Sequence, residues 1–190
     1  MYHKIQRVQK VLNRAAMHAD RFGKTSGLTC AAGCNRCCVK KDIHASPLEF
    51  FPLAYHLVKT GLAESFYERL EQIPDNDMCV LFSALGETPG SCSNYAYRGL
   101  ICRLFGFSSV PDKQGHYRMV TCKTLKETPA FGRLTPKILE KAPVFSAYYM
   151  QLAAIDFVLA NEQLHINKAI KRALELVSSY YLYRRPGKRA

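Results

Sequence analysis

The arrangement of the cysteines constrains this chain more than any other feature of its sequence. The chain holds eight cysteines among 190 residues, and four of them lie in residues 30–38, which read CAAGCNRCC. The others follow at wider intervals, so the fold has to assemble any shared centre from separate segments. The eight are Cys30, Cys34, Cys37, Cys38, Cys79, Cys92, Cys102 and Cys122.

The cellular compartment decides which chemistry these cysteines can have. The N-terminal residues MYHKIQRVQKVLNRAAM are basic and polar, and they lack the apolar stretch of a secretory signal. We therefore expect a cytoplasmic protein, and disulfides are rare in that reducing compartment. The cysteines are then expected to be free thiols or metal ligands.

Four interpretations of the cysteines compete. Free cysteines are often buried as small apolar side chains, but four of them beside Asn35 and Arg36 do not resemble a core. A disulfide framework requires export. The spacing Cys30-x3-Cys34-x2-Cys37 matches the cluster loop of radical-SAM enzymes, but this chain lacks their length and their repeating strand–helix pattern. The fourth is a zinc or iron–sulfur site, since thiols two or three residues apart turn onto one centre.

The rest of the pattern predicts a mainly α domain with a short β-hairpin. A heptad-like apolar stripe predicts a helix over residues 2–22, ended by Gly23 and Gly27. Ser46 and Glu49 form a capping box that predicts a helix to Lys59, followed by a shorter one to about residue 72. FSSV and HYRMVTC flank PDKQG as the strands of a hairpin.

The C-terminal part, residues 136–183, is predicted to be helical. One long helix is expected over residues 143–160, and a last amphipathic helix follows from Ile166. The first has the length of a membrane span, but it contains Gln151 and Asp156, and a central Asp costs about 2.5–3.5 kcal/mol on insertion. We expect a buried helix and no membrane insertion. A single domain over residues 1–190 is predicted.

The ordered cysteine motifs resemble the YkgJ-type cysteine cluster family, also called CxxCxxCC proteins. The resemblance is carried by residues 28–124: the first cysteine run, Cys79-Val-Leu-Phe, the block CSNYAYRGLICRLFGF from Cys92, and Cys122. This chain has three residues after Cys30 where the family has two, and Gly99 where the family usually has proline. The resemblance implies that the cysteines chelate zinc or iron. Larger relatives, the flagellin lysine N-methylases, are enzymes, but no glycine-rich loop for S-adenosylmethionine is present here. A redox or methyltransferase-related enzyme stays an alternative, and so does a basic nucleic-acid-associated protein with a structural zinc.

Eight cysteines suffice for two four-ligand sites. Zinc takes four thiolates, or three and a histidine such as His44 or His116. A [4Fe–4S] cluster also takes four. Cys37 and Cys38 are adjacent and point in different directions, so we expect them to serve two centres, or one of them to be structural. An iron–sulfur cluster is favoured, because the ligands come from distant segments with cations nearby that offset thiolate charge. These cations are Arg36, Lys40, Lys41, Arg98 and Arg103.

Three side chains are expected to support the bound cofactor. Arg98 and Arg103 have several donors for cluster sulfurs or for carbonyl groups of the ligand loops, and Tyr95 lies in the same motif. The net charge of +12 also favours an acidic partner, either a protein or a nucleic acid. Tyr180, Tyr181 and Tyr183 are possible stacking groups for such a nucleic acid.

Overall fold

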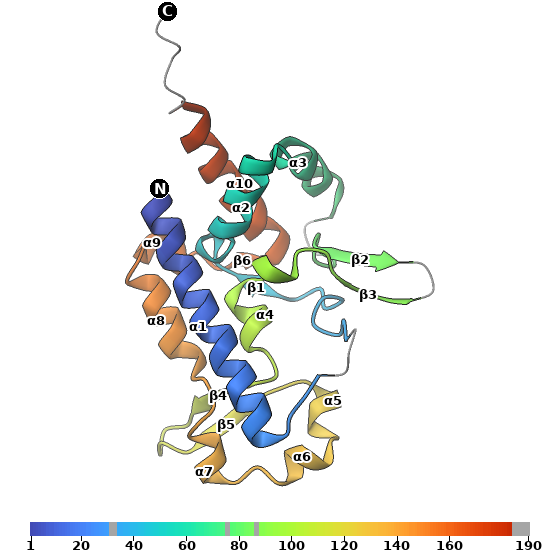
Figure 1. Ribbon diagram of the computed structural model, residues 1–190, viewed down its shortest axis with the longest axis vertical. Coiled ribbons are helices and arrows are strands. Elements are labelled where there is room, and N and C mark those ends of the chain that lie inside the picture. The colour runs from blue at the N-terminus through green and yellow to red at the C-terminus, as the bar shows by residue number, and fades with distance from the viewer. Residues whose placement is uncertain (31–33, 75–76, 86–87, 184–190) are drawn as a thin grey trace, which may run out of the picture.

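The computed structural model describes residues 1–30, 34–74, 77–85 and 88–183. Helix α1 (Tyr2–Ser26) runs along the long axis, with α8 (Phe145–Ala153) and α9 (Phe157–Asn161) on one side and the cysteine-bearing segments on the other (Figure 1). Helices predominate and the described strands form only two-stranded sheets, so the prediction of a mainly α fold is confirmed. None of the described helices is both long and apolar enough to cross a membrane.

Helix α1 is one turn longer than its sequence predicts. The whole predicted apolar stripe, from Ile5 to Phe22, is buried. Gly23 stays inside the helix, where an added Cβ would meet the Leu28 carbonyl oxygen at 3.0 Å. The helix ends instead at Gly27, whose φ of 72° is in the left-handed region that glycine adopts without strain.

The capping box at residues 46–49 is confirmed. It starts the short 3-10 helix η1 (Pro47–Phe50), which leads directly into α2 (Phe51–Thr60). The shorter helix that follows, α3 (Ala63–Gln72), also agrees with the sequence. These helices cover α10 (Ile166–Tyr183), the predicted last amphipathic helix, at one end of the molecule (Figure 1).

The prediction of one long helix over residues 143–160 is wrong. The chain forms α8 and α9 instead, with a break before Phe157. Asp156 causes the break: its Oδ1 accepts a hydrogen bond from the Leu159 N–H at 3.0 Å and so caps α9. Its other carboxylate oxygen pairs with Lys4 Nζ at 2.6 Å, which ties the corner to α1.

The strands of the described residues form three antiparallel pairs. β4 (Ser108–Pro111) and β5 (Tyr117–Val120) are the predicted hairpin, which is therefore confirmed. β2 (Phe82–Leu85) and β3 (Thr88–Cys92) form a second pair that the sequence did not reveal. β1 (His44–Ala45) pairs with β6 (Leu164–His165) and fastens the end of the first cysteine loop to the start of α10.

Short helices complete the chain around the cysteines. After η2 (Tyr95–Tyr97) comes α4 (Leu100–Leu104), which packs against α1. Three single-turn helices follow β5 at the far end of the molecule (Figure 1). They are α5 (Lys123–Lys126), α6 (Pro129–Gly132) and α7 (Pro136–Leu139).

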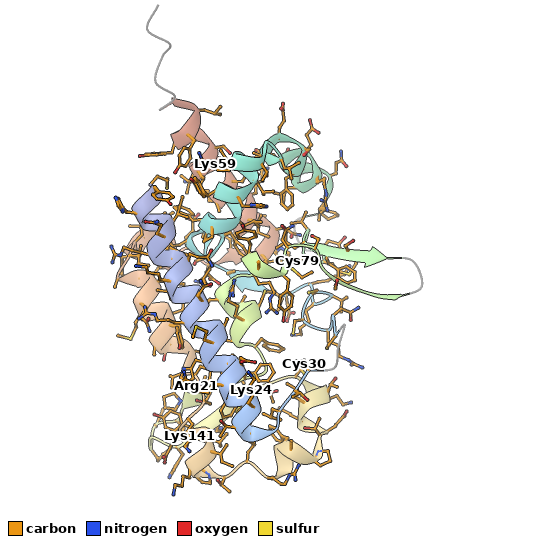
Figure 2. The ribbon with its side chains drawn as sticks, viewed as in Figure 1. Arg21, Lys24, Cys30, Lys59, Cys79 and Lys141 are labelled. Carbon is orange, nitrogen blue, oxygen red and sulfur yellow. The ribbon has the colours of Figure 1, made fainter. Side chains whose placement is uncertain are left out.

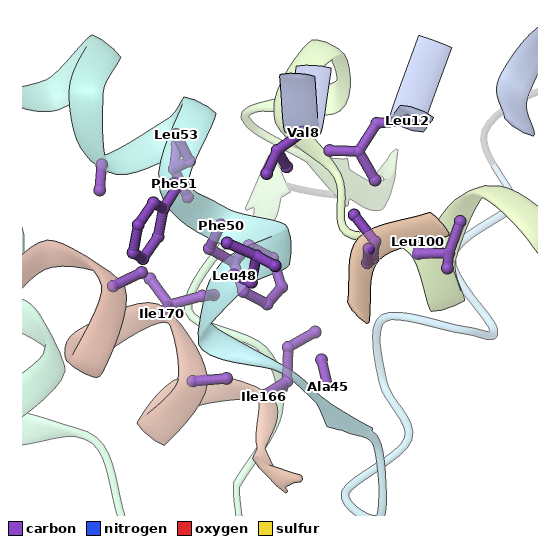
Figure 3. Close-up of a cluster of buried hydrophobic side chains, with 14 of the residues drawn as sticks. Val8, Leu12, Ala45, Leu48, Phe50, Phe51, Leu53, Leu100, Ile166 and Ile170 are labelled. Carbon is purple, nitrogen blue, oxygen red and sulfur yellow. The ribbon is translucent and has the colours of Figure 1, made fainter. Parts of the chain in front are cut away.

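The main core lies between α1, η1, α4 and α10. Figure 3 shows Phe50 and Leu48 of η1 between Leu100 on one side and Ile166 and Ile170 on the other. All of them are at most 2% exposed. Each large apolar side chain that is buried in this way stabilises the fold by about 1.5–3 kcal/mol. The core therefore fixes α4 and η1, and both border the cysteine-bearing segments.

Candidate metal centre

The cysteine-bearing segments lie on the same side of α1. Figure 2 shows Cys79 above Cys30 on this side. All eight cysteines are free thiols. Cys30 and Cys34 are exposed, and the other six are half-buried. Residues 31–33 of the first cysteine run lie outside the described residues.

Four thiols, which we call the first thiol set, gather between the loop after α1 and the start of α5: Cys30, Cys34, Cys37 and Cys122. Burial, followed by the thiolates of Cys30, Cys38, Cys122 and Cys34, raises the pKa of Cys37 to about 12. Burial, then Cys34 and Cys122, raises the pKa of Cys30. A like charge has this effect only at short range, so Cys30, Cys34 and Cys122 lie near Cys37, and so does the adjacent Cys38.

Backbone hydrogen bonds hold the first thiol set in place at two points. The N–H groups of Cys38 and Val39 both donate to the Asn35 carbonyl, at 2.7 and 3.2 Å, and this turns the loop back on itself. Cys122 is the N-cap residue of α5, and its Sγ accepts a hydrogen bond from the Leu125 N–H at 3.4 Å. The remote thiol of this set is thus fixed by a helix start.

The remaining thiols, Cys38, Cys79, Cys92 and Cys102, make up the second thiol set. Burial, with contributions from Cys92 and Cys38, raises the pKa of Cys79 to about 12. Burial, then Cys79, Glu49 and Cys38, raises the pKa of Cys102 well above its usual range. Cys79, Cys92 and Cys102 also pack against the main core. The second thiol set is therefore the more deeply placed of the two.

The fold brings the second thiol set together through a hairpin and a helix. The turn at Cys79 is closed by its carbonyl, which accepts from the Phe82 N–H at 2.8 Å. Phe82 then pairs with Cys92 across β2 and β3. Cys102 comes from α4. Two pKa effects act between the sets, and both involve Cys38. Cys38 raises the pKa of Cys37, and Cys34 raises the pKa of Cys38.

The thiols of neither set close around a point. Within residues 1–30, 34–74, 77–85 and 88–183, no three Cys, His, Asp or Glu side chains are arranged to hold a metal ion. The donor set still fits a thiolate-ligated metal, because each set supplies four free thiols and a bound cation displaces their protons. Metal binding has to draw the thiols of a set closer together than they lie here.

Comparison with known proteins places these cysteines in a family. Residues 29–141, more than half of the chain, match the CxxCxxCC family, whose description is "Putative zinc- or iron-chelating domain". The chain belongs to the CxxCxxCC family. The resemblance predicted from the cysteine motifs is confirmed. No curated protein and no solved structure is similar enough to count as a match.

In this CxxCxxCC protein, Arg98 is a cation that lowers thiol pKa values in both thiol sets. It lowers the pKa values of Cys30 in the first set and of Cys38, Cys92 and Cys102 in the second, against the larger effect of burial. Its Nη1 donates to the Cys102 carbonyl at 3.5 Å and its Nε to the Tyr95 carbonyl at 3.3 Å. These bonds go to carbonyl groups of the cysteine-bearing segment, one of the two roles that the sequence predicts.

Tyr95 and Arg103 hold Arg98 and its segment in place. The Arg98 guanidinium lies 3.4 Å from the centroid of the Tyr95 ring, a cation–π contact on a tyrosine that is 65% exposed. Arg103 is buried, and it donates hydrogen bonds to the carbonyls of Arg98 and Ala96. Arg103 therefore fastens η2 to α4.

The predicted lysines and histidines have other partners. Lys40 pairs with Asp42 at 3.3 Å, and Lys41 with Asp77 at 3.0 Å. His116 pairs with Asp112 at 3.6 Å on the β4–β5 hairpin. His44 lies beside the Asp42 carbonyl and the His165 ring. The charge-offsetting role expected of five cations is best supported for Arg98.

Sequence reasoning missed Asn167, which holds the Cys79 segment. Its Oδ1 accepts from the Val80 N–H at 2.8 Å, and its Nδ2 donates to the Met78 carbonyl at 3.0 Å. Asn167 is 4% exposed and lies in the first turn of α10. A polar residue inside an apolar helix stripe was the only signal, and its partner lies almost ninety positions away.

Proposed function

We propose that this CxxCxxCC protein chelates metal at two four-thiol sites, one in each thiol set, in a reducing compartment such as the cytoplasm. The observation that carries the proposal is the division of the thiols by their mutual pKa effects. The pKa of Cys37 is raised by Cys30, Cys122 and Cys34 of the first thiol set and also by the adjacent Cys38, whereas the thiols that raise the pKa values of Cys79 and Cys102 belong to the second set. Each set has the four thiols that a closed zinc site or a [4Fe–4S] cluster requires.

Burial makes the thiols harder to deprotonate, and Arg98 offsets part of that effect. Cys37 and Cys79 have pKa values near 12, so both are protonated at neutral pH in the absence of metal. A bound cation stabilises the thiolates and releases their protons. Arg98 contributes positive charge to both sets. The thiolates of Cys37 and Cys79 are therefore expected to form only when a metal ion binds.

We infer that the occupant is an iron–sulfur cluster, with zinc as the alternative. The ligands of the second thiol set come from four separate segments, and the first has a remote fourth ligand in Cys122, as is common in iron–sulfur proteins. A cluster would supply one-electron redox chemistry, suited to electron transfer or sensing, whereas zinc would supply structure. Sequence distance between ligands favours the cluster, since compact zinc knuckles take their ligands from closer spacings.

Anaerobic purification with metal and sulfide analysis tests this proposal. We expect iron and acid-labile sulfide in equal amounts, together with the broad visible absorption of thiolate-ligated iron. A colourless protein that carries zinc would contradict the cluster and keep the two thiol sites. A chain that retains no metal and binds neither zinc nor iron under reducing conditions would contradict metal chelation itself.

A second candidate function is nucleic-acid binding by the exposed face of α1. Lys10, Arg14, Arg21 and Lys24 are exposed and follow one another at intervals of three, four or seven residues, so they lie on one stripe of the helix. The stripe spans about 21 Å at 1.5 Å per residue. Figure 2 shows Arg21 and Lys24 at one end of it, with Lys141 on the neighbouring segment. Lys24 is paired with Asp20 at 2.8 Å, so Lys10, Arg14 and Arg21 are the cations of this stripe that fit the phosphates of a nucleic-acid strand.

Salt-dependent binding to a random duplex tests this candidate. Replacing Arg14 and Arg21 with Gln should reduce the slope of log K against log salt by about two, since each phosphate contact contributes about 0.9. The matched control replaces Lys59 and Lys113, which are also exposed. The candidate is rejected if the native chain does not bind the duplex at low salt.

A further inference from the structure

Glu49 is a fully buried acidic residue that the proposed metal sites do not use as a ligand. It is 0% exposed and lies in η1, next to the core residue Phe50. Its pKa is raised by burial, and hydrogen bonds from backbone N–H groups and from Ser46 oppose that rise. A buried carboxylate is costly unless its oxygens are satisfied, so its contacts indicate what it does.

Five hydrogen-bond donors converge on the two oxygens of Glu49. Oε1 accepts from the Ser46 N–H at 2.8 Å, from the Ser46 hydroxyl at 3.1 Å and from the Tyr149 hydroxyl at 3.3 Å. Oε2 accepts from the N–H groups of Leu100 at 2.6 Å and Ile101 at 3.4 Å. The carboxylate therefore joins three parts of the chain: the end of the first cysteine loop, α8 and the start of α4.

Gly99 makes this approach possible. An added Cβ at position 99 would lie 3.0 Å from Glu49 Oε2 and 2.9 Å from Phe50 Cζ. The backbone of Gly99 is extended, with φ −64° and ψ 172°, so glycine is needed here for space and not for its dihedral angles. The absence of a side chain at position 99 thus lets the carboxylate reach α4.

We propose that Glu49 is a positioning residue for the second thiol set, fixing Cys102 on α4 relative to the segment that carries Cys38. The inference rests on the two-site function proposed above. Glu49 binds the N–H groups of the two residues that precede Cys102, and it binds Ser46, which follows the Cys38 loop through β1. The carboxylate thereby sets the distance between two of the four thiols. It does not reach the first thiol set, whose remote ligand is held by α5.

Cobalt(II) titrated into the reduced, metal-free full chain tests this inference, with the thiolate-to-cobalt absorption as the readout. We expect the native chain to bind two cobalt ions, of which Cys102→Ser abolishes one and Cys122→Ser the other. Glu49→Gln should lower the affinity for cobalt at the site that Cys102→Ser abolishes by about 10–100-fold. This is the usual effect of losing a residue that orients a ligand. The other ion serves as an internal control for folding and should bind as before. Glu68→Gln, the same change on an exposed residue of α3, should leave both ions unaffected.

Milder variants keep the test decisive if Glu49→Gln does not fold. Tyr149→Phe removes one of the five donors, and Gly99→Ala presses on Oε2 without altering the carboxylate. Both variants should lower the cobalt affinity of that same site and leave the other site unchanged. Unchanged affinity of that ion in these variants, or equal weakening of both ions in a folded protein, would overturn the positioning role. If the native chain binds no cobalt, zinc or iron, the two-site function itself fails, and the two results are therefore distinguishable.

Discussion

Cys37 and Cys38 are neighbours in the chain, but after burial different thiols make the largest contribution to their raised pKa values. The pKa of Cys37 is raised most by burial and then by Cys30, whereas the pKa of Cys38 is raised most by burial and then by Cys92. The tight turn at Asn35 places this pair between the two thiol sets. One dipeptide therefore supplies a thiol to each set, and the arrangement predicts that the two sites are close together and share the charge of Arg98.

Replacing Arg98 with Gln should weaken metal binding at both sites. Arg98 lowers the pKa values of Cys30, Cys38 and Cys102, so its loss makes those thiols harder to deprotonate. We expect about a tenfold loss of affinity at neutral pH, as for other groups that surround a ligand shell. Competition with a chromophoric chelator measures it. Arg36→Gln, an exposed arginine of the same loop, is the control; equal losses in both variants would contradict a specific role for Arg98.

Asn167→Ala should loosen the segment that carries Cys79. The substitution leaves the Val80 N–H and the Met78 carbonyl without the side chain that now pairs with them. Each buried group without a partner costs about 1–3 kcal/mol. Urea unfolding of the metal-free chain should show this loss, and metal bound by the second thiol set should exchange faster. Asn161→Ala, on the exposed face of α9, should change the unfolding free energy by less than about 0.5 kcal/mol. A similarly small change for Asn167→Ala would contradict the assignment.

The Lys4–Asp156 ion pair should contribute stability only above acidic pH. Burial alone would raise the pKa of Asp156, but hydrogen bonds from Lys4 and from backbone N–H groups outweigh it and lower the pKa below 3.8. A carboxyl whose pKa is lower in the folded state stabilises that state at pH values above its pKa in the unfolded chain. This stabilisation is lost as the pH falls through the pKa of the folded state. Lys4→Met should therefore lower the unfolding free energy by about 1 kcal/mol at pH 7. The difference should disappear as the pH falls well below 3.8.

An exposed ion pair of the same helix provides the comparison for Lys4. Lys24 and Asp20 lie 2.8 Å apart, and their side chains are 77% and 64% exposed. Lys24→Met should change the unfolding free energy by much less, because solvent screens exposed pairs. Unfolding curves of both variants at several pH values decide the matter. A difference for Lys4→Met that persists in acid would show that packing, and not the charge of Asp156, is responsible.

Local patterns predicted the elements that depend on local interactions. The buried stripe of α1, the capping box at Ser46 and Glu49, and the β4–β5 hairpin follow from periodicity and turn residues, and all are confirmed. The break between α8 and α9 could not be predicted in this way. Asp156 caps α9 and pairs with Lys4, which lies 152 positions away, and hydropathy contains no trace of that contact.

The sequence predicted which residues belong to the candidate site better than it predicted their arrangement. The cysteine motifs indicated the family, and Tyr95, Arg98 and Arg103 do lie together beside Cys102. The division of the thiols into two sets depends on the pairing of β2 with β3 and on the position of α5, which are tertiary features. For the same reason Glu49 was predicted as a helix cap, and its contacts with α4 were not.

The most direct test of the two-site account compares Cys37→Ser with Cys38→Ser. The number of metal ions or clusters per chain is measured in each variant and in the double variant, after reconstitution under reducing conditions. The account predicts that each single variant loses one centre, that the two losses are of different centres with different spectra, and that the double variant loses both. If both single variants lose the same centre, or if either one loses all bound metal while remaining folded, the eight cysteines do not form two four-thiol sites.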